Sequence, residues 1–393
     1  MSNPSSRDRG ASHAGGPARE ASLLITKLVA GGEGLGFIDG KAVFVPGVLP
    51  GETVRVRMVQ RRRDFERGAL IEVLTPSAQR VSPPCRLAGV CGGCDWLHIS
   101  YAEQLARKVE LVRETLRRTG RIEWPRIDIE PSPPLASRGR AQIHRDEQGR
   151  LGYMGAGSNR VVPVETCPIV VPSINGLFSG ALPSPQTLGR FTVWSDGEQV
   201  ATEGIDDARD LTALVCGRPI SLSVGCFFQS NLAVLQKLVP WTIEGLSGAA
   251  AADLYSGVGL FGAFLHGRFE RIVCVESSTL SISFARRNSA GPGSEFYPMD
   301  VEQWISSGAA KGPFDAVIVD PPRIGLSPEV RQWLCDSPPA RLVYVSCNPV
   351  TLARDLGQLC AQGFTLEQLK LFDFYPQTSH VEAVAHLARG GPR

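Results

Sequence analysis

The sequence predicts an α/β protein whose C-terminal part is an open, mostly parallel sheet, preceded by a small β-barrel and a β-rich middle region. Three observations lead to this fold class. Short strands separated by turn glycines occupy residues 22–77, no long helical pattern occurs over residues 124–225, and strand-like and helical segments alternate from about residue 227. A chain of 393 residues is long enough for each part to bury a core of its own.

The bulk composition is that of an ordinary globular protein. Apolar residues make up 43% and charged residues 20%, and the formal net charge is only +2, so a nucleic-acid-binding surface would have to be local. No apolar stretch is long enough to span a membrane, and residues 1–21 lack the apolar core of a signal peptide. We expect residues 1–21 to be a disordered tail and the protein to be cytoplasmic, with its ten cysteines reduced.

Residues 22–78 predict a barrel of short strands. Asp39-Gly40 is a hairpin signal between two apolar runs, and TVRVRMVQ alternates apolar with basic side chains. So many short strands in so short a segment indicate a closed or partly open barrel of the OB type. Four arginines crowd one loop, either as a phosphate-binding rim or as a solvated charge cluster. These are Arg61, Arg62, Arg63 and Arg67.

Residues 79–226 form the predicted middle region, which contains one clear helix over residues 101–119. Its apolar residues recur at helical spacing, and Gly120 suits its end. The apolar positions are Leu105, Val109, Val112 and Leu116, and the opposite, basic face carries Arg107, Lys108, Arg113, Arg117 and Arg118. We expect the apolar face to pack on another part of the protein, of which the C-terminal domain is one option.

Four cysteines of the middle region are spaced like metal ligands. Cys85, Cys91 and Cys94 stand close together, and Cys167 follows in VETCPI. The set could bind zinc or an iron–sulfur cluster, although the five-residue gap between the first two fits paired zinc knuckles poorly. Cysteines elsewhere, apart from Cys347, are interpreted as ordinary buried thiols. These are Cys216, Cys226, Cys274, Cys335 and Cys360.

Seven strand candidates follow from residue 227 onward. They are AAAADLY, RIVCVES, EFYPMD, FDAVIVDPP, RLVYVSC, LEQLKLFDFY and EAVAHLA. Helical segments separate the first five, whereas the last two follow each other closely, as in a hairpin. Ligands of open parallel sheets bind at the carboxyl ends of the strands. The residues at or just beyond those ends are Ser256, Glu276, Asp300, Asp320 and Cys347.

A glycine-rich segment follows the first of these strands. Gly257, Gly259 and Gly262 in GVGLFG match the G-x-G-x-x-G pattern, which both NAD and S-adenosylmethionine sites use. Alone the pattern is weak, and a glycine turn without a ligand is the alternative. Asp253 precedes the glycines, where a carboxylate disfavours a pyrophosphate and suits a ligand that carries an ammonium and a sulfonium.

Asp253, Asp300 and Asp320 favour methyl transfer over hydride transfer by a dehydrogenase, whereas Glu276 suits either cofactor. Glu276 lies near the distance expected for a ribose-binding carboxylate, and Asp300 could accept a hydrogen bond from an adenine amino group. Asp320 begins DPPR, at a position where many methyltransferases orient their target base. Methyl transfer from S-adenosylmethionine is therefore the favoured chemistry.

Cys347 ends an apolar, β-branched run, and Pro349 prevents the strand from continuing. Carbon 5 of a pyrimidine is a poor nucleophile toward a methyl sulfonium, but a thiolate added to carbon 6 makes an enolate that activates it. A base must then remove the carbon-5 proton, and Glu382 is the candidate, with His380 second. A helix beginning at Pro349 would favour the thiolate. Taken alone, a buried core thiol and a solvated strand edge remain the alternatives.

Five segments occur in a characteristic order: GCFFQSN, DLYSGVGLFG, DPPRIGL, VSCNPVTLARDL and PQTSHVEAV. Together they resemble the RNA uracil-5-methyltransferase family, most specifically in SCNPVTLARDL, and the resemblance covers nearly the whole chain after residue 21. It implies a class I, Rossmann-like S-adenosylmethionine-dependent methyltransferase domain over residues 227–393. By this resemblance Cys347 is the nucleophile and Glu382 the general base.

The resemblance also implies a set of cofactor or uracil contacts. Gln229, Tyr255, Glu276 and Asp320 match family positions. The complete predicted cofactor-binding set is Gln229, Tyr255, Gly257, Gly259, Leu260, Glu276, Asp300 and Asp320. Two departures are mild, since Ser256 stands where many members have cysteine and Leu260 at a variable position.

The remaining implications concern the N-terminal half and the substrate. A [4Fe–4S] cluster with a structural role is implied for Cys85, Cys91, Cys94 and Cys167, and residues 22–78 resemble a TRAM domain, an RNA-binding module. The combination is most similar to the branch that methylates a uridine of 23S ribosomal RNA, at a site of the U1939 type. A T-loop uridine of transfer RNA and another 23S site are alternatives. The non-enzyme alternative is an RNA-binding or assembly protein. We expect a monomer that binds RNA and no membrane.

Overall fold

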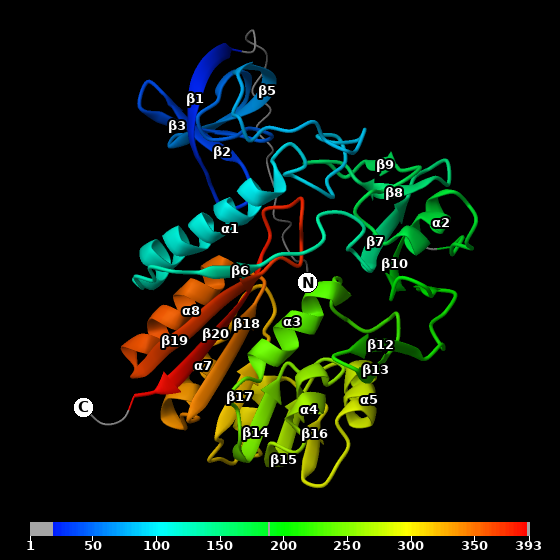
Figure 1. The fold of residues 1–393 in the computed structure, drawn as a ribbon, viewed down its shortest axis with the longest axis vertical. Coiled ribbons are helices and arrows are strands. Elements are labelled where there is room, and N and C mark those ends of the chain that lie inside the picture. Colours follow the sequence, from blue (N-terminus) through cyan, green and yellow to red (C-terminus); the bar gives the residue numbers. More distant parts are fainter. Residues whose placement is uncertain (1–18, 188, 391–393) are drawn as a thin grey trace, which may run out of the picture. The chain divides into compact units, whose positions relative to one another are not determined.

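The computed structural model describes residues 19–187 and 189–390. The chain divides into two compact units, and the boundary in the sequence lies between Arg80 and Val81. Figure 1 shows the elements of both. We predicted that residues 1–21 form a disordered tail. Residues 1–18 of that tail lie outside the described residues. The prediction is wrong for Glu20 and Ala21, because both belong to the first strand. Within the described part of the chain, no helix is both long and apolar enough to cross a membrane.

The first unit is a closed five-stranded barrel, as predicted. Its strands, in order around the barrel, are β1 (Glu20–Leu28), β2 (Gly34–Ile38), β3 (Lys41–Val45), β5 (Phe65–Thr75) and β4 (Thr53–Arg61). Strands β3 and β5 pair in parallel, and the other neighbours are antiparallel. Asp39 and Gly40, with φ of 50° and 77°, make the predicted hairpin turn. Alternate apolar residues such as Val43, Val45 and Val54 fill the interior.

Two of the four predicted rim arginines are engaged in ion pairs inside the barrel unit. Arg61 Nε donates to Glu66 Oε1 at 2.9 Å, and Arg67 Nη1 donates to Glu33 Oε1 at 2.7 Å. Their charges are therefore partly neutralised. Among the described residues, Arg62 and Arg63 make no ion pair and remain the rim's available cations.

The second unit is organised around an eight-stranded sheet of order β16-β15-β14-β17-β18-β20-β19-β6. All seven predicted strands are present: β14 (Gly248–Leu254), β15 (Phe269–Val275), β16 (Ser294–Tyr297), β17 (Ala316–Val319), β18 (Arg341–Ser346), β19 (Phe364–Phe372) and β20 (Glu382–Arg389). The first five run parallel, and β20 is antiparallel to both β18 and β19, which confirms the predicted terminal hairpin.

Helices cover both faces of this sheet. They are α3 (Leu232–Thr242), α4 (Leu260–Leu265), α5 (Thr279–Asn288), α6 (Val301–Ser306), α7 (Pro328–Asp336) and α8 (Pro349–Ala361). Neighbouring residues of β14 enter different cores: Ala251 packs with α3, α4 and α5, whereas Ala252 packs with α6, α7 and α8. The sheet is therefore buried on both sides, as its apolar strand sequences predict.

The predicted middle region, residues 79–226, contributes to this sheet as well. Helix α1 (Tyr101–Thr115) continues as a π-helical turn, η1 (Leu116–Gly120), and β6 (Asp128–Glu130) pairs in parallel with β19 at the sheet edge. A Cβ on Gly120 would lie 2.6 Å from the carbonyl oxygen of Ala353, so η1 packs directly on the backbone of α8. Strands β12 (Leu211–Val215) and β13 (Arg218–Leu222) join the core of α3. The predicted boundary at residue 226 thus does not separate two packing units.

Lys108 was predicted to belong to the basic face of α1. Its side chain is instead fully buried. Its Nζ lies 2.5 Å from Asp373 Oδ1 and donates to the carbonyl of Tyr375 at 2.9 Å. The hydroxyl of Tyr101 donates to the other oxygen of Asp373 at 2.8 Å. Burial lowers the pKa of Lys108, and the charge of Asp373 opposes that effect. The pair fixes α1 to the end of β19.

The rest of the middle region is β-rich, as predicted. It contains a five-stranded sheet of order β11 (Val200–Thr202), β10 (Arg190–Ser195), β7 (Arg140–Arg145), β8 (Leu151–Met154) and β9 (Val161–Pro163). A 3-10 turn, η2 (Pro172–Ile174), and the short helix α2 (Asn175–Phe178) cover it. Ile143, Phe191 and Val193 form its separate apolar core with Ile174.

Candidate active site and four-cysteine site

One cleft at the carboxyl ends of the parallel strands gathers nearly all the residues predicted for catalysis and cofactor binding. Those that line it are Gln229, Tyr255, Gly257, Leu260, Glu276, Asp300, Asp320, Cys347 and Glu382. Most of them follow β14, β15, β17 and β18 or lie in neighbouring loops, and Leu260 and Glu382 are the first residues of α4 and β20. The carboxyl ends of the parallel strands lie at the same edge of the sheet, which brings these residues together. Residues as far apart in sequence as Gln229 and Glu382 therefore share one surface.

The glycine loop between β14 and α4 is fixed by a carboxylate and by close packing. Glu276 Oε2 accepts from the backbone N–H of Gly257 at 3.0 Å, and its other oxygen accepts from Ser278 N at 2.7 Å. Gly259 has φ of 78°, and a Cβ there would lie 2.8 Å from Ala285 Cα. Gly259 is not among the residues that line the cleft. The structure gives Gly259 a helix-packing role, and its predicted cofactor contact stays a prediction.

Asp253 and Asp300 also support the loops around the cleft. Asp253 is fully buried and its Oδ2 accepts from Gly262 N at 2.8 Å, while burial raises its pKa to about 7. Asp300 is exposed and caps α6 in a capping box with Gln303. It lies beyond the end of β16 at Tyr297, so its predicted position at the strand end was three residues off.

The polar groups of the cleft fit S-adenosylmethionine. Gln229 Oε1 and Ser256 Oγ are buried and make no hydrogen bond with other described residues, as expected where a ligand supplies the partner. Tyr255 adopts a left-handed backbone with φ of 61°, a conformation common at ligand sites. The carboxylates of Glu276 and Asp300 suit hydroxyl, amino and cationic groups, whereas a dinucleotide would place its pyrophosphate among negative charges.

Cys347 lies between the end of β18 and the start of α8, as the sequence predicts. Asn348 caps the helix by accepting from Val350 N at 3.1 Å. The thiol is half-buried, and burial raises the pKa of Cys347 to about 11, with Glu382 and Asp320 acting in the same direction and Arg323 opposing them. Cys347 is therefore a thiol at neutral pH, and the predicted effect of the helix start does not outweigh burial.

Glu382 and Asp320 are two acidic residues of the same cleft. Glu382 is 2% exposed, and burial followed by the charge of Asp320 raises its pKa well above the ordinary value. Burial raises the pKa of Asp320 to about 7. Both groups hold protons more tightly than ordinary carboxyls, so each is a stronger base when ionised. His380, the second candidate for the base, lies in the loop before β20, which begins at Glu382.

Two residues of the cleft were missed in the sequence. Arg323 lowers the pKa of Cys347 and of Glu382, and its carbonyl accepts from Asn348 Nδ2 at 2.8 Å. Its position directly after Asp-Pro-Pro was the available signal. Tyr375 lines the cleft from the loop between β19 and β20, and no spacing rule singles it out.

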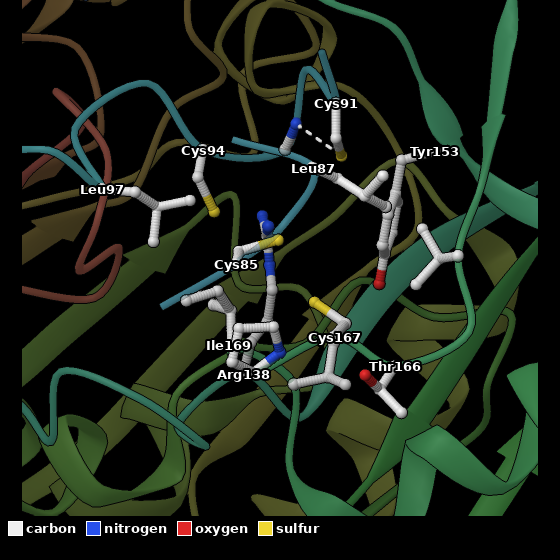
Figure 2. Close-up of a pocket in the computed structure, with 14 residues that line it drawn as sticks. Cys85, Leu87, Cys91, Cys94, Leu97, Arg138, Tyr153, Thr166, Cys167 and Ile169 are labelled. Carbon is white, nitrogen blue, oxygen red and sulfur yellow. Dashed lines mark hydrogen bonds between the residues drawn. The ribbon is translucent and has the colours of Figure 1, made fainter. Parts of the chain in front are cut away.

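The four cysteines of the middle region line a second, separate pocket (Figure 2). Figure 2 shows the sulfur atoms of Cys85, Cys94 and Cys167 directed toward a common space that Arg138 also enters. The backbone N–H of Gly93 donates to the sulfur of Cys91 at 3.4 Å. The main chain at Cys167 is fixed by the amide of Asn175, which accepts from its N–H at 2.8 Å.

Four cysteine side chains line this pocket, and the described residues show no group of three His, Cys, Asp or Glu side chains placed as ligands for a metal ion. A cluster binds each thiolate through a different iron and so accepts more widely spaced sulfurs than zinc, whose ligands surround one point. Burial and then Cys167 raise the pKa of Cys94 to about 12. Arg138 Nε is buried there without a hydrogen bond to other described residues, and the Tyr153 hydroxyl lies beside the thiol of Cys167.

The sheet order, the glycine loop and the cleft at the strand ends are those of an α/β methyltransferase fold. A sequence model of the tRNA (Uracil-5-)-methyltransferase family matches residues 310–390, and one of the TRAM domain matches residues 19–71. An uncharacterized RNA methyltransferase of Treponema denticola is 32% identical over 88% of this chain and 93% of its own length. The chain belongs to the RNA uracil-5-methyltransferase family.

Two further relatives agree with this assignment. The 23S rRNA (uracil(1939)-C(5))-methyltransferase RlmD of Shewanella sp. MR-7 is 29% identical over 90% of this chain and 92% of its own. The crystal structure of Pyrococcus abyssi tRNA (uracil-54, C5)-methyltransferase with S-adenosyl-L-homocysteine matches with a TM-score of 0.73. It shares 25% sequence identity, and the match covers 94% of this chain and all of that one. The protein is an RNA methyltransferase, and the non-catalytic alternative is set aside.

Proposed function

We propose that the protein methylates carbon 5 of a uridine in 23S ribosomal RNA, at a site of the 1939 type, through a covalent adduct with Cys347. The observation that carries the chemistry is the meeting of the Cys347 thiol, the carboxyls of Asp320 and Glu382 and the glycine loop in a single cleft. The ribosomal substrate is supported by the relatives of Shewanella that carry this activity in their name. The adduct explains why the cleft contains a cysteine at all.

The first half of the reaction uses Cys347. Its thiol loses a proton to solvent, a loss that Arg323 favours, and the sulfur bonds to carbon 6 of the uracil. The electrons of the ring double bond move onto the carbon-4 oxygen and make an enolate. S-adenosylmethionine, when bound, supplies the methyl group, and the carbon-5 bond to it forms as the sulfonium bond breaks.

The second half uses Glu382. Its carboxylate takes the proton from carbon 5, the ring double bond re-forms, and the bond between carbon 6 and the sulfur of Cys347 breaks. Glu382 suits this step because its raised pKa makes it a stronger base than an ordinary carboxylate. Asp320, beside it, would orient the uracil. Gln229, Tyr255, Gly257, Leu260, Glu276 and Asp300 would hold the cofactor.

The four-cysteine pocket would hold a [4Fe–4S] cluster. Its support is the donor set of Cys85, Cys91, Cys94 and Cys167, which line one pocket together with the buried, unpartnered Nε of Arg138. Methyl transfer moves no net electrons, so we assign the cluster a structural role. Anaerobically purified protein is expected to contain about four irons per chain, and stoichiometric zinc without iron would overturn the assignment.

Transfer RNA is the second candidate substrate, because the Pyrococcus abyssi neighbour is named for uracil 54 of tRNA and its structure covers nearly the whole chain. The deciding experiment maps 5-methyluridine in ribosomal and transfer RNA from a strain that lacks the gene and from the complemented strain. Loss of one 23S site supports the proposal, whereas loss of the T-loop modification alone supports tRNA. A monomeric state and a cytoplasmic location remain predictions.

A further inference from the structure

The loop between β19 and β20 connects the cleft with the four-cysteine region. It consists of residues 373–381, contributes Tyr375 to the cleft and leads directly into Glu382. Gln377 at its centre is buried and has φ of 66°, a backbone conformation that side-chain-bearing residues rarely adopt. Such a conformation persists only where surrounding contacts impose it.

The residues that follow Cys94 supply some of those contacts. The carboxylate of Asp95 accepts from the backbone N–H of Ser379, with its two oxygens at 3.0 and 3.3 Å. The backbone N–H of Trp96 donates to the carbonyl of Gln377 at 3.0 Å, and Trp96 is completely buried. A segment that begins at a predicted cluster ligand is thus bonded to the loop that precedes the proposed base.

Helix α1 holds the same loop from a second side. Gln104 Nε2 donates a hydrogen bond to Gln377 Oε1 at 2.9 Å. Gln104 Oε1 in turn accepts from the backbone N–H of Gln377 at 2.9 Å. Gln104 Nε2 also donates to the carbonyl of Trp96 at 3.2 Å, so one side chain bonds to both segments. In Figure 1 the loop between β19 and β20 lies beside the N-terminal end of α1.

We propose that Asp95 and Gln377 are positioning residues that transmit the geometry of the four-cysteine site to Glu382. Cluster binding at Cys94 fixes the next two residues, these fix the loop, and the loop fixes the carboxylate that removes the carbon-5 proton. This inference rests on the proposed function. A general base must lie within hydrogen-bond reach of its proton, so a displacement of about 1 Å lowers the rate on the order of 10²-fold.

The two halves of the reaction respond differently to a displaced base. Formation of the bond from Cys347 to carbon 6 and the methyl transfer need no base at carbon 5. If Glu382 is displaced, the carbon-5 proton stays in place, the bond from carbon 6 to sulfur does not break, and methylated protein–RNA adduct accumulates. A cluster that supports RNA binding or folding alone lowers the yield of product without accumulation of adduct.

The test uses full-length, iron-loaded protein and in vitro transcribed 23S rRNA, or transfer RNA if the wild type methylates that. Radiolabelled methyl groups are followed into free RNA and into covalent complex on denaturing gels. For Asp95→Ala we expect elimination to slow by about 10- to 100-fold and adduct to accumulate. Asp95→Asn keeps one acceptor oxygen and should recover most of the rate. Asp336→Ala, a surface change at the end of α7, is the matched control and should behave as wild type.

A second variant keeps the test informative if Asp95→Ala loses iron. Gln377→Gly tolerates the left-handed backbone, leaves the cysteines untouched and removes the amide that meets Gln104. It should retain full iron and still accumulate adduct. Hydrogen exchange of peptides over residues 375–381 should be faster in both variants than in wild type and unchanged in Asp336→Ala.

Glu382→Gln separates failure of this inference from failure of the proposed function. If Glu382→Gln accumulates adduct but Asp95→Ala and Gln377→Gly do not, Asp95 and Gln377 do not position the base and the inference is overturned. If Glu382→Gln itself accumulates no adduct, Glu382 is not the base that removes the carbon-5 proton. The proposed mechanism is then overturned, and the inference that rests on it is overturned with it. A loss of product in Asp95→Ala without adduct also contradicts the inference.

Discussion

The cleft and the four-cysteine pocket both contain thiols with raised pKa values, but their surroundings differ. In the cleft one cysteine, Cys347, faces two carboxyls and one arginine. In the pocket, four cysteines lie together among apolar side chains, and the pKa of Cys94 is raised by burial and then by Cys167. The neighbours of the two buried thiols thus act differently: Arg323 lowers the pKa of Cys347, whereas Cys167 and Cys91 raise that of Cys94 further.

The largest effect that this comparison predicts is the loss of methylation in Cys347→Ala. Without the sulfur, carbon 5 is not activated, and we expect methyl transfer to fall by at least about 10³-fold while RNA binding persists. Incorporation of labelled methyl groups into RNA and a filter-binding assay measure the two quantities. Cys216→Ser, at an exposed cysteine outside both sites, should remain active. Substantial transfer by Cys347→Ala would refute the nucleophile assignment.

The next effect concerns the ion pair that joins α1 to the end of β19. Lys108→Met leaves Asp373 buried without its counter-charge, and we expect the free energy of unfolding to fall by about 3–5 kcal/mol. All six tryptophans lie after residue 80, so their fluorescence during chemical unfolding reports on the second unit. Lys237→Met, at an exposed position of α3, is the control and should change stability by less than about 0.5 kcal/mol. Equal effects of the two changes would contradict the prediction.

A third variant changes a residue of the pocket and leaves every residue of the cleft in the chain. Cys94→Ser removes one proposed cluster ligand, and we expect iron to fall from about four atoms per chain to less than one. Methylation should decrease less than in Cys347→Ala, because the reacting thiol is intact. Iron analysis beside the methylation assay separates the two sites. Full iron content in Cys94→Ser would mean that this cysteine is not a ligand.

The last prediction concerns the response of the rate to pH, which changes the protonation of the cleft and replaces no residue. The reaction needs Cys347 as thiolate and Glu382 ionised, and both pKa values are raised, so kcat/KM should increase with pH from 6 to 9 by up to about tenfold per unit. Arg323→Met removes the charge that lowers both pKa values, and its profile should move to higher pH. Single-turnover rates measure both profiles. A maximum below pH 7 would contradict the assignment.

Much of the fold could be predicted because local patterns determine it. The seven apolar runs after residue 227 all became strands, and Asp39-Gly40 made its turn, since both depend on neighbouring residues. Strand β6 was missed because its three residues gain their pairing from β19, far along the chain. Lys108 was misplaced for the same reason: helical spacing puts it on a polar face, and its partner Asp373 is distant in sequence.

The residues of the candidate site could be predicted where a recognisable motif contains them, and could not be predicted where no motif does. Asp320, Cys347 and Glu382 stand at or near strand ends in recognisable segments, and the structure brings them into one cleft. Gly259 illustrates the limit, since one glycine pattern cannot separate ligand approach from helix packing. The contacts of Asp95 and Gln377 could not be predicted, because hydrogen bonds between distant loops leave no periodic signal.

The most direct test of the account is the identity of the protein atom that bonds to RNA. Glu382→Gln is incubated with S-adenosylmethionine and substrate RNA, digested with nuclease and protease, and analysed by mass spectrometry. We predict a peptide that contains Cys347 and carries a methylated uridine on its sulfur. A modified peptide from another cysteine, or methylated RNA released with no adduct at any stage, would contradict the account.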